Sequence, residues 1–229
     1  MADKLDEMRF KSSVADPNVW MRPYVSPDGE EYYEYILMYV EDILAISMQP
    51  RDVMKDIEQR FRFNNDKVEE PYSYLGARLQ KKVINGWYYW AVTSLDYVKA
   101  SVATVEEAIK MATRQLSNKV LTSMVQSYLP EPEAIEELEP ADNQFFQELI
   151  VMLRWDTEIV RVDVLLERSL LSQYQALLRV VHMVQALHIF AYLKKKPKLT
   201  LYYYPGFSRM DYSNFRTKRE DFWEHFRHT

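Results

Sequence analysis

Two neighbouring carboxylates, Glu41 and Asp42, are the residues of this chain whose type and spacing are best suited to chemistry. They stand between two apolar strand-like runs, residues 36–40 and 43–46, so we expect them at the tip of a β-hairpin. Carboxylate oxygens are ligands that Mg²⁺ prefers, and a pair of such ions assists phosphoryl transfer. Taken alone, the two residues fit a solvated polar hairpin tip better than a metal site, so both interpretations remain open here.

The elements that must position this tip form a β-rich first part of the chain. Ser26-Pro27-Asp28-Gly29 predicts a turn because proline presets φ and glycine accepts a positive φ. Asn85-Gly86 is a strong hairpin signal between two apolar runs. The expected strands span residues 18–22, 31–39, 43–47, 74–82 and 87–93, and a helix is expected over 49–61.

The rest of the chain has the pattern of helices. Between the first and second of them, residues 116–142 are acidic and interrupted by prolines, which predicts a linker. Pro197 ends the last helix, and a strand-like exit follows at 200–204. The expected helices span residues 94–114, 144–155, 162–174 and 178–194. The expected fold class is therefore α+β, with a first part over 1–93, a helical part over 94–196 and a basic C-terminal extension over 197–229.

Composition limits the class of protein. The chain of 229 residues is 48% hydrophobic, which is enough to bury a core in one or two domains. It has no cysteine, which favours an intracellular protein, cytoplasmic or nuclear, and excludes thiolate metal sites. The most apolar window, 176–193, contains Arg179, His182 and Gln185, so we expect a buried helix and no membrane partner. The net charge of −5 argues mildly against a free-standing nucleic-acid binder.

An ordered series of short motifs resembles the C-terminal half of a copia-type LTR-retrotransposon reverse transcriptase, over nearly the whole chain. The matching segments are Phe10–Trp20, Tyr39–Ser47, Ser73–Gly76, Phe145–Ile150, Leu153–Trp155, Arg161–Val164, Leu170–Tyr174 and Ile189–Lys194. The resemblance implies a partial palm made of antiparallel hairpins and a helix, followed by a helical thumb and connection. It also implies an RNA-directed DNA polymerase that joins dNTPs to a primer with the help of Mg²⁺.

The resemblance assigns roles to named residues. Asp42 and Glu41 stand where the family holds its catalytic metal, and Tyr39 stands where the primer end is contacted; a core aromatic is the alternative for Tyr39. Leu75-Gly76 stands at a turn that resembles a primer grip, where a plain hairpin bend is the alternative. Lys194, Lys195 and Lys196 would meet the template–primer duplex, although cations also favour helix C-termini.

Three departures from the family predict that the chain is inactive as it stands. Glu41 replaces an aspartate and is one methylene longer, while Mg²⁺ demands near-ideal geometry. The family's upstream catalytic aspartate has no counterpart among the 38 residues before Tyr39. We also expect that the RNase H domain that follows the thumb in this family is missing, and that a partner chain would have to complete the metal site.

Other interpretations remain beside this one. The chain fits a host-retained scaffold that binds nucleic acid or protein without chemistry, including self-association through unpaired sheet edges. It also fits a decaying remnant with no selected function. His182 on an apolar helix is expected to be a satisfied core histidine. Alternating burial in a strand explains the run Trp87–Trp90 better than base stacking does.

Overall fold

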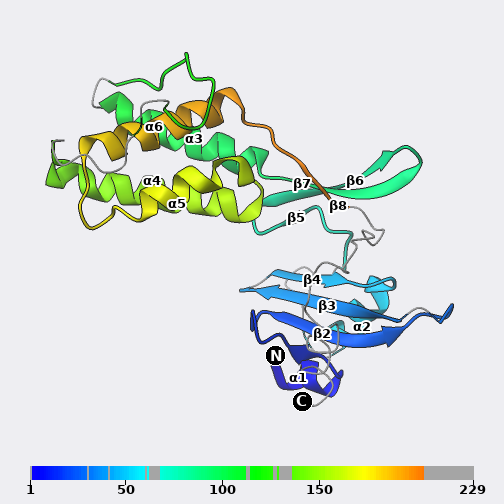
Figure 1. The fold of residues 1–229 in the computed structure, drawn as a ribbon. Helices are drawn as coiled ribbons and strands as arrows, with labels where there is room; N and C mark the ends of the chain where they lie inside the picture. Colours follow the sequence, from blue (N-terminus) through cyan, green and yellow to red (C-terminus); the bar gives the residue numbers. More distant parts are fainter. Residues whose placement is uncertain are drawn as a thin grey trace, which may run out of the picture.

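The computed structural model has an α+β fold with two four-stranded antiparallel sheets and a group of helices (Figure 1). It describes residues 2–29, 31–40, 42–59, 61, 68–111, 114–125, 128 and 136–203. Glu41 and residues 204–229 of the predicted C-terminal extension lie outside this described part. In Figure 1, the first sheet and two short helices, α1 (Ala2–Glu7) and α2 (Pro50–Glu58), lie at one end of the molecule, and the helices α3–α6 lie at the other end.

The first sheet has the strand order β1-β2-β3-β4. Its strands are β1 (Lys11–Ser12), β2 (Val19–Val25), β3 (Glu31–Tyr39) and β4 (Asp42–Ile46). The turn at residues 26–29 is confirmed, because the Gly29 N–H donates to the Ser26 carbonyl at 2.9 Å and Gly29 has a φ of +83°. The strand at 18–22 is longer than expected, because β2 pairs with β3 through Val25.

Two helices cover one face of this sheet. They are α1 (Ala2–Glu7) and α2 (Pro50–Glu58), and the helix expected over 49–61 is thus confirmed. Trp20 of β2 and Ile36 of β3 are directly paired, so their side chains lie on the same face of the sheet, beneath the helices. The buried side chains of this core are Leu5, Met8, Phe10, Trp20, Ile36, Val53 and Ile57.

A buried ion pair between Arg22 and Glu34 connects the first sheet to the segments that follow α1 and β4. Arg22 Nε donates to Glu34 Oε2 at 2.6 Å, and Ser47 Oγ donates to Glu34 Oε1 at 2.6 Å. Arg22 Nη1 also donates to the Met8 carbonyl at 3.0 Å, and its guanidinium lies over the Phe10 ring. These contacts satisfy the buried Glu34 carboxylate, which would otherwise be costly to remove from water.

The second sheet has the order β5-β6-β7-β8. Its strands are β5 (Ser73–Tyr74), β6 (Ala77–Ile84), β7 (Trp87–Thr93) and β8 (Leu201–Tyr203). The hairpin at Asn85-Gly86 is confirmed, since both residues have the positive φ that a type I′ turn needs. The sequence predicts a strand-like exit at 200–204 but does not say which strand it pairs with. The structure pairs β8 with β7, so the chain returns to the β-rich part.

The helical part is a bundle with its own core. Its elements are α3 (Leu95–Met111), α4 (Pro140–Ile159), the 3-10 turn η1 (Val162–Val164), α5 (Leu165–Ser172) and α6 (Val180–Lys195). The buried face of α6 includes His182, Met183, Ala186, Ile189 and Phe190. Periodicity predicts one buried face made of Val181, Val184, Leu187, His188 and Ala191. Ala191 is buried as expected, but Val184 is exposed.

The prediction of a linker over 116–142 is wrong for its described residues. Leu116, Val120 and Leu138 are buried in the core of the bundle, and the Leu138 N–H donates to the Leu178 carbonyl at 3.0 Å. Acids and prolines indicated a solvated segment, but three widely spaced apolar side chains are enough to hold an irregular chain against helices.

Candidate functional site

The tip of the β3–β4 hairpin carries the residues that the sequence singles out. Tyr39 and Asp42 are directly paired at the ends of β3 and β4, and Val40 follows Tyr39 with a φ of +53°. A β-branched residue rarely adopts a positive φ, so this tip is strained. Asp42 is exposed and Val40 almost fully so. Glu41 lies outside the described residues, so its predicted metal role has no geometry here.

The turn that resembles a primer grip has a similar backbone. Tyr74 and Ala77 are paired across β5 and β6, which leaves Leu75 and Gly76 as a two-residue loop. Both have positive φ values, +53° and +78°. A Cβ added at Gly76 would lie 3.6 Å from Nε1 of Trp155, an ordinary contact distance. Glycine is therefore required here by the backbone conformation rather than by close approach.

These two turns meet at the C-terminal half of α4. The ring centroid of Tyr39 lies 6.1 Å from that of Trp155, with the planes tilted by 54°. Burial, and then the nearby negative charges of Asp42 and Asp16, raises the pKa of Tyr74. The cluster of Tyr39, Asp42, Tyr74, Gly76 and Trp155 is called the junction below. It brings together segments that are more than a hundred residues apart.

Sequence reasoning found most of the junction but missed the role of Trp155. This tryptophan appeared there as part of a motif, and nothing in its own neighbourhood distinguishes it from a core aromatic. Asp16 has a local role as well, since its Oδ1 accepts the Asn18 N–H at 2.9 Å and shapes the loop before β2.

The described residues do not supply a set of ligands that fits a two-metal centre. Among them, no three His, Asp or Glu side chains gather closely enough to hold a metal ion. Asp42 is the carboxylate that the described hairpin tip contributes, and Mg²⁺ bound by protein needs further oxygen ligands in octahedral positions.

The three predicted lysines lie at the C-terminal end of α6, and their contacts differ. Lys194 Nζ pairs with Glu106 of α3 at 2.7 Å, so this cation supports the bundle. Lys195 and Lys196 have exposed side chains. The carbonyl of Lys196 accepts a hydrogen bond from Arg161 Nη1 at 2.7 Å.

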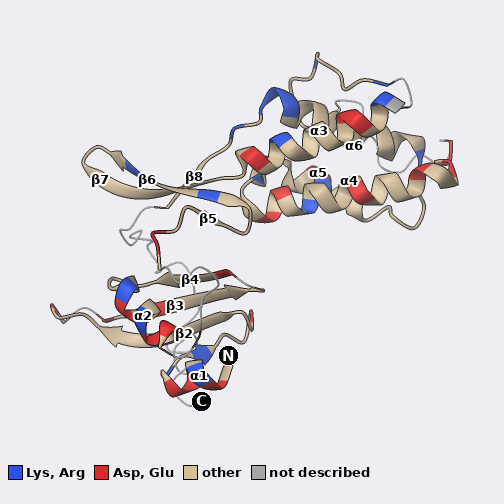
Figure 2. Ribbon diagram, turned by 180° about the vertical axis from the view of Figure 1, so that it is seen from behind, with Lys and Arg blue, Asp and Glu red and all other residues tan. Residues whose placement is uncertain are grey.

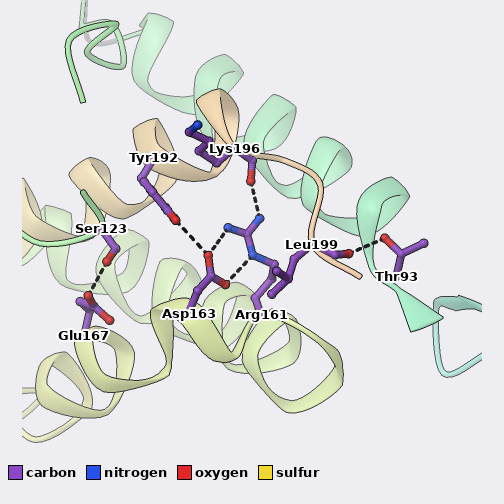
Figure 3. Close-up of polar contacts among 8 residues, drawn as sticks. All are labelled: Thr93, Ser123, Arg161, Asp163, Glu167, Tyr192, Lys196 and Leu199. Carbon is purple, nitrogen blue, oxygen red and sulfur yellow. Dashed lines mark hydrogen bonds and ion pairs between the residues drawn. The ribbon is translucent and has the colours of Figure 1, made fainter. Parts of the chain in front are cut away.

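Arg161 is a fully buried charge that sequence reasoning noted as part of a motif without a role. Its Nε and Nη2 donate to the two carboxylate oxygens of Asp163 at 2.8 and 2.7 Å, and Tyr192 Oη donates to Asp163 at 3.1 Å (Figure 3). Burial by itself raises the pKa of Asp163, but the hydrogen bonds and charge of Arg161 bring it below its ordinary value. This network fixes the end of α6 against η1.

Two further polar groups, His182 and Asp156, are buried among the helices. His182 accepts the Arg179 N–H on Nδ1 at 3.1 Å and stacks on Tyr174, which confirms a satisfied core histidine. Asp156 is buried beside Ser101, whose Oγ lies 3.5 Å from Oδ2, while Oδ1 has no hydrogen-bond partner. Burial raises the pKa of Asp156 to about 7, although Arg161 and Ser101 oppose the shift.

Comparisons with known proteins add no relative, since no family model, curated protein or solved structure matches this chain. None of the helices in the described part has the length and apolar character that a membrane crossing demands.

Proposed function

We propose that this chain is the palm hairpin, primer grip and thumb of a copia-type reverse transcriptase, and that it binds template–primer nucleic acid without extending it. The observation that supports this proposal best is the junction. Tyr39 and Asp42, the Tyr74–Gly76 turn and Trp155 come from three of the motifs that carry the resemblance, and they meet in space.

The junction has the chemistry to hold a nucleic-acid end. Tyr39 is exposed at its edge and Trp155 is half-buried beside it, so the terminal base of a duplex has an aromatic surface on which to stack. Leu75 and Gly76 present backbone in a tight turn next to these rings. Lys195 and Lys196 supply exposed cations at the end of the thumb for the phosphates of the duplex.

The same residues argue against nucleotidyl transfer by this chain alone. Two-metal catalysis needs carboxylates on both sides of the ions, held within narrow limits. The described junction provides Asp42, and the other acid of the pair, Glu41, is one methylene longer than the expected aspartate. Without a bound cation, the charge of Asp42 repels phosphate, so this carboxylate works against binding rather than for it.

The experiment measures primer extension and template–primer binding in the same tubes, with Mg²⁺ and separately with Mn²⁺. We expect no extension, but a measurable change of fluorescence anisotropy when a labelled template–primer duplex binds. Tyr39→Ala and Trp155→Ala should weaken binding by about tenfold, the effect of losing one stacked base. Tyr39→Phe, which keeps the ring, is the matched control and should bind like the wild type.

Asp42 separates the two parts of the proposal. In EDTA, Asp42→Asn should strengthen binding because it removes a negative charge from the junction. Extension that disappears in Asp42→Ala would show that the chain is a polymerase. Failure of the wild type to bind any template–primer would rule out the nucleic-acid function altogether.

One observation favours a second candidate function, a protein-interaction scaffold. β4 pairs with β3 on one side, and no strand among the described residues pairs with its other edge. Ile46 and Met48 at the end of this edge are exposed, and an open apolar edge is suited to pairing with another strand. A mass that doubles with concentration and returns to that of one chain in Ile46→Lys would support this function.

A further inference from the structure

The outer half of the β6–β7 hairpin has no strand beside it in the described structure. β5 pairs with β6 at Ala77 and Arg78, and β8 pairs with β7 from Trp90 to Val92. The strands between these contacts and the Asn85-Gly86 turn form a two-stranded ribbon that extends away from the helices (Figure 1). A ribbon of two strands is marginally stable in water, so it gains from a ligand that covers it.

One face of this ribbon is aromatic. Directly paired residues share a face, so the register places Tyr88 beside Val83, and Trp90 between Lys81 and Tyr203. These five residues are called the hairpin face. Tyr88 is 68% exposed and Tyr203 is 56% exposed. The expectation that alternating burial explains the aromatic run is therefore wrong, because Trp87 on the opposite face is exposed as well.

Charge on the ribbon is of one sign. Residues 77–93 include Arg78, Lys81 and Lys82 and no acid, in a chain whose net charge is −5 (Figure 2). Acids from outside the ribbon reach two of these cations, since Glu70 pairs with Lys81 and Asp96 with Arg78. Lys81 lies on the hairpin face, whereas Lys82 is paired with Tyr89 and lies on the opposite face of the ribbon.

One cation is already placed against a ring. Lys81 Nζ lies 5.1 Å from the centroid of the Trp90 ring, within the range of a cation–π contact. A phosphate that approaches Lys81 therefore brings its neighbouring base next to Trp90. Tyr88 is two residues further along the same face, at a spacing of about 6.8 Å along the strand.

We propose that the hairpin face binds single-stranded nucleic acid, with bases stacked on Tyr88, Trp90 and Tyr203 and phosphates held by Lys81. Exposed rings next to cations are the recurring elements of sites that bind single strands without reading sequence. A duplex keeps its bases stacked inside and has no free base faces to offer, so the single strand is the favoured ligand. This inference extends the proposed function, because a template–primer carries a single-stranded template overhang.

A second copy of the chain is the less favoured occupant. Strand pairing at the β6 edge would bring the cations of one ribbon towards those of another, and lysines on an edge strand oppose such pairing. Positive charge on the ribbon attracts a polyanion and repels an identical ribbon.

The experiment uses the full chain and two labelled probes, a twelve-nucleotide oligothymidylate and a blunt-ended duplex, with binding followed by fluorescence anisotropy. Tyr88→Ala should weaken binding of the oligothymidylate by about tenfold, and Tyr88→Ala with Tyr203→Ala by about a hundredfold. Trp87→Ala, which removes an exposed ring from the opposite face of the same ribbon, should change it less than twofold. Tyr88→Phe keeps the stacking ring and should restore binding.

Salt dependence tests the electrostatic half of the proposal. Lys81→Gln should reduce the slope of log affinity against log salt by about 0.7, the change expected when the protein neutralises one phosphate fewer on a single strand. Equal binding by wild type and Tyr88→Ala would overturn the inference. So would a mass that doubles with concentration in the wild type and not in Tyr88→Ala, because the ribbon would then be covered by a second copy.

The two proposals fail separately. Binding of the blunt duplex without binding of the oligothymidylate would overturn the hairpin face and leave the junction standing. Binding of the oligothymidylate that is sensitive to Tyr88→Ala, with no binding of the duplex, would support the hairpin face and count against the junction.

Discussion

The ring of Tyr39 at the tip of the first hairpin lies 6.1 Å from the indole of Trp155 in α4, and this contact joins the first sheet to the helical bundle. The two residues are far apart in the sequence, and Tyr39 is exposed while Trp155 is half-buried. Aromatic pairs in such tilted arrangements are worth about 0.5–1.5 kcal/mol beyond the area that they bury. The Tyr39–Trp155 pair therefore contributes to the position of the hairpin tip relative to the helical bundle.

A double-mutant cycle measures this contact. Tyr39→Ala and Trp155→Ala should show a coupling of about 0.5–1.5 kcal/mol in the free energy of unfolding by urea, because each change removes one partner of the same pair. The pair Tyr33→Ala and Trp155→Ala is the control and should be additive, since Tyr33 lies further back on β3, where it contacts Tyr35. Additive effects of Tyr39 and Trp155 would mean that the rings do not interact in solution.

Strain at the hairpin tip leads to a stability prediction. Val40 has a φ of +53°, which is unfavourable for a β-branched residue, and it is 93% exposed, so packing of its side chain does not compensate for this strain. Val40→Asn should raise the free energy of unfolding by about 1 kcal/mol, because asparagine tolerates the left-handed region better than a β-branched residue. Val14→Asn is the control, since Val14 is 83% exposed and is not among the residues with a positive φ. A decrease in stability for Val40→Asn would contradict the strained turn.

The raised pKa of Asp156 leads us to expect that the stability of the chain depends on pH. Its pKa of about 7 in the folded chain exceeds the ordinary value of 3.8, so the folded state keeps a proton that the unfolded chain has released between those two pH values. Stability from this group is therefore present below about pH 4 and is lost as the pH rises towards 7. Asp156→Asn should remove that loss and, relative to the wild type, gain a few kcal/mol between pH 4 and pH 8.

Thermal or urea unfolding at several pH values checks this result. Asp142→Asn, a change at a half-buried residue in the first turn of the same helix, is the control and should leave the pH profile of the wild type unchanged. Parallel profiles for wild type and Asp156→Asn would show that the buried carboxyl titrates normally.

Removal of Arg161 should be the most damaging single change in the bundle. Arg161→Met leaves Asp163 without its bidentate partner and the Lys196 carbonyl without its donor. We expect a loss of about 3–5 kcal/mol in the free energy of unfolding, as for other broken buried pairs. Adding Asp163→Asn should recover part of this loss, because the unpaired charge is then gone. If Arg161→Met lowers the free energy of unfolding by less than about 1 kcal/mol, the guanidinium is exposed to water in solution and the prediction is wrong.

Local rules predicted much of the fold. Local φ preferences explain the turn at Ser26–Gly29 and the hairpin at Asn85-Gly86. Helical periodicity explains why Val53 and Ile57 of α2 are buried together. Both properties depend only on residues a few positions apart in the sequence. The positive φ at Leu75 was not predicted, because leucine carries no preference for it; the two-residue loop between β5 and β6 imposes it.

The sequence by itself determined the turns at Ser26–Gly29 and Asn85-Gly86 and the approximate positions of most strands and helices. It also identified Tyr39, Asp42 and Gly76 as candidate site residues. Only the tertiary structure decided that Trp155 meets them, that β8 pairs with β7, and that Tyr88 and Tyr203 remain exposed on one face. The physical reason is sequence separation. Contacts between distant segments depend on how whole elements pack, and the exposure of a strand depends on whether another element covers it, so neither can be read from local pattern.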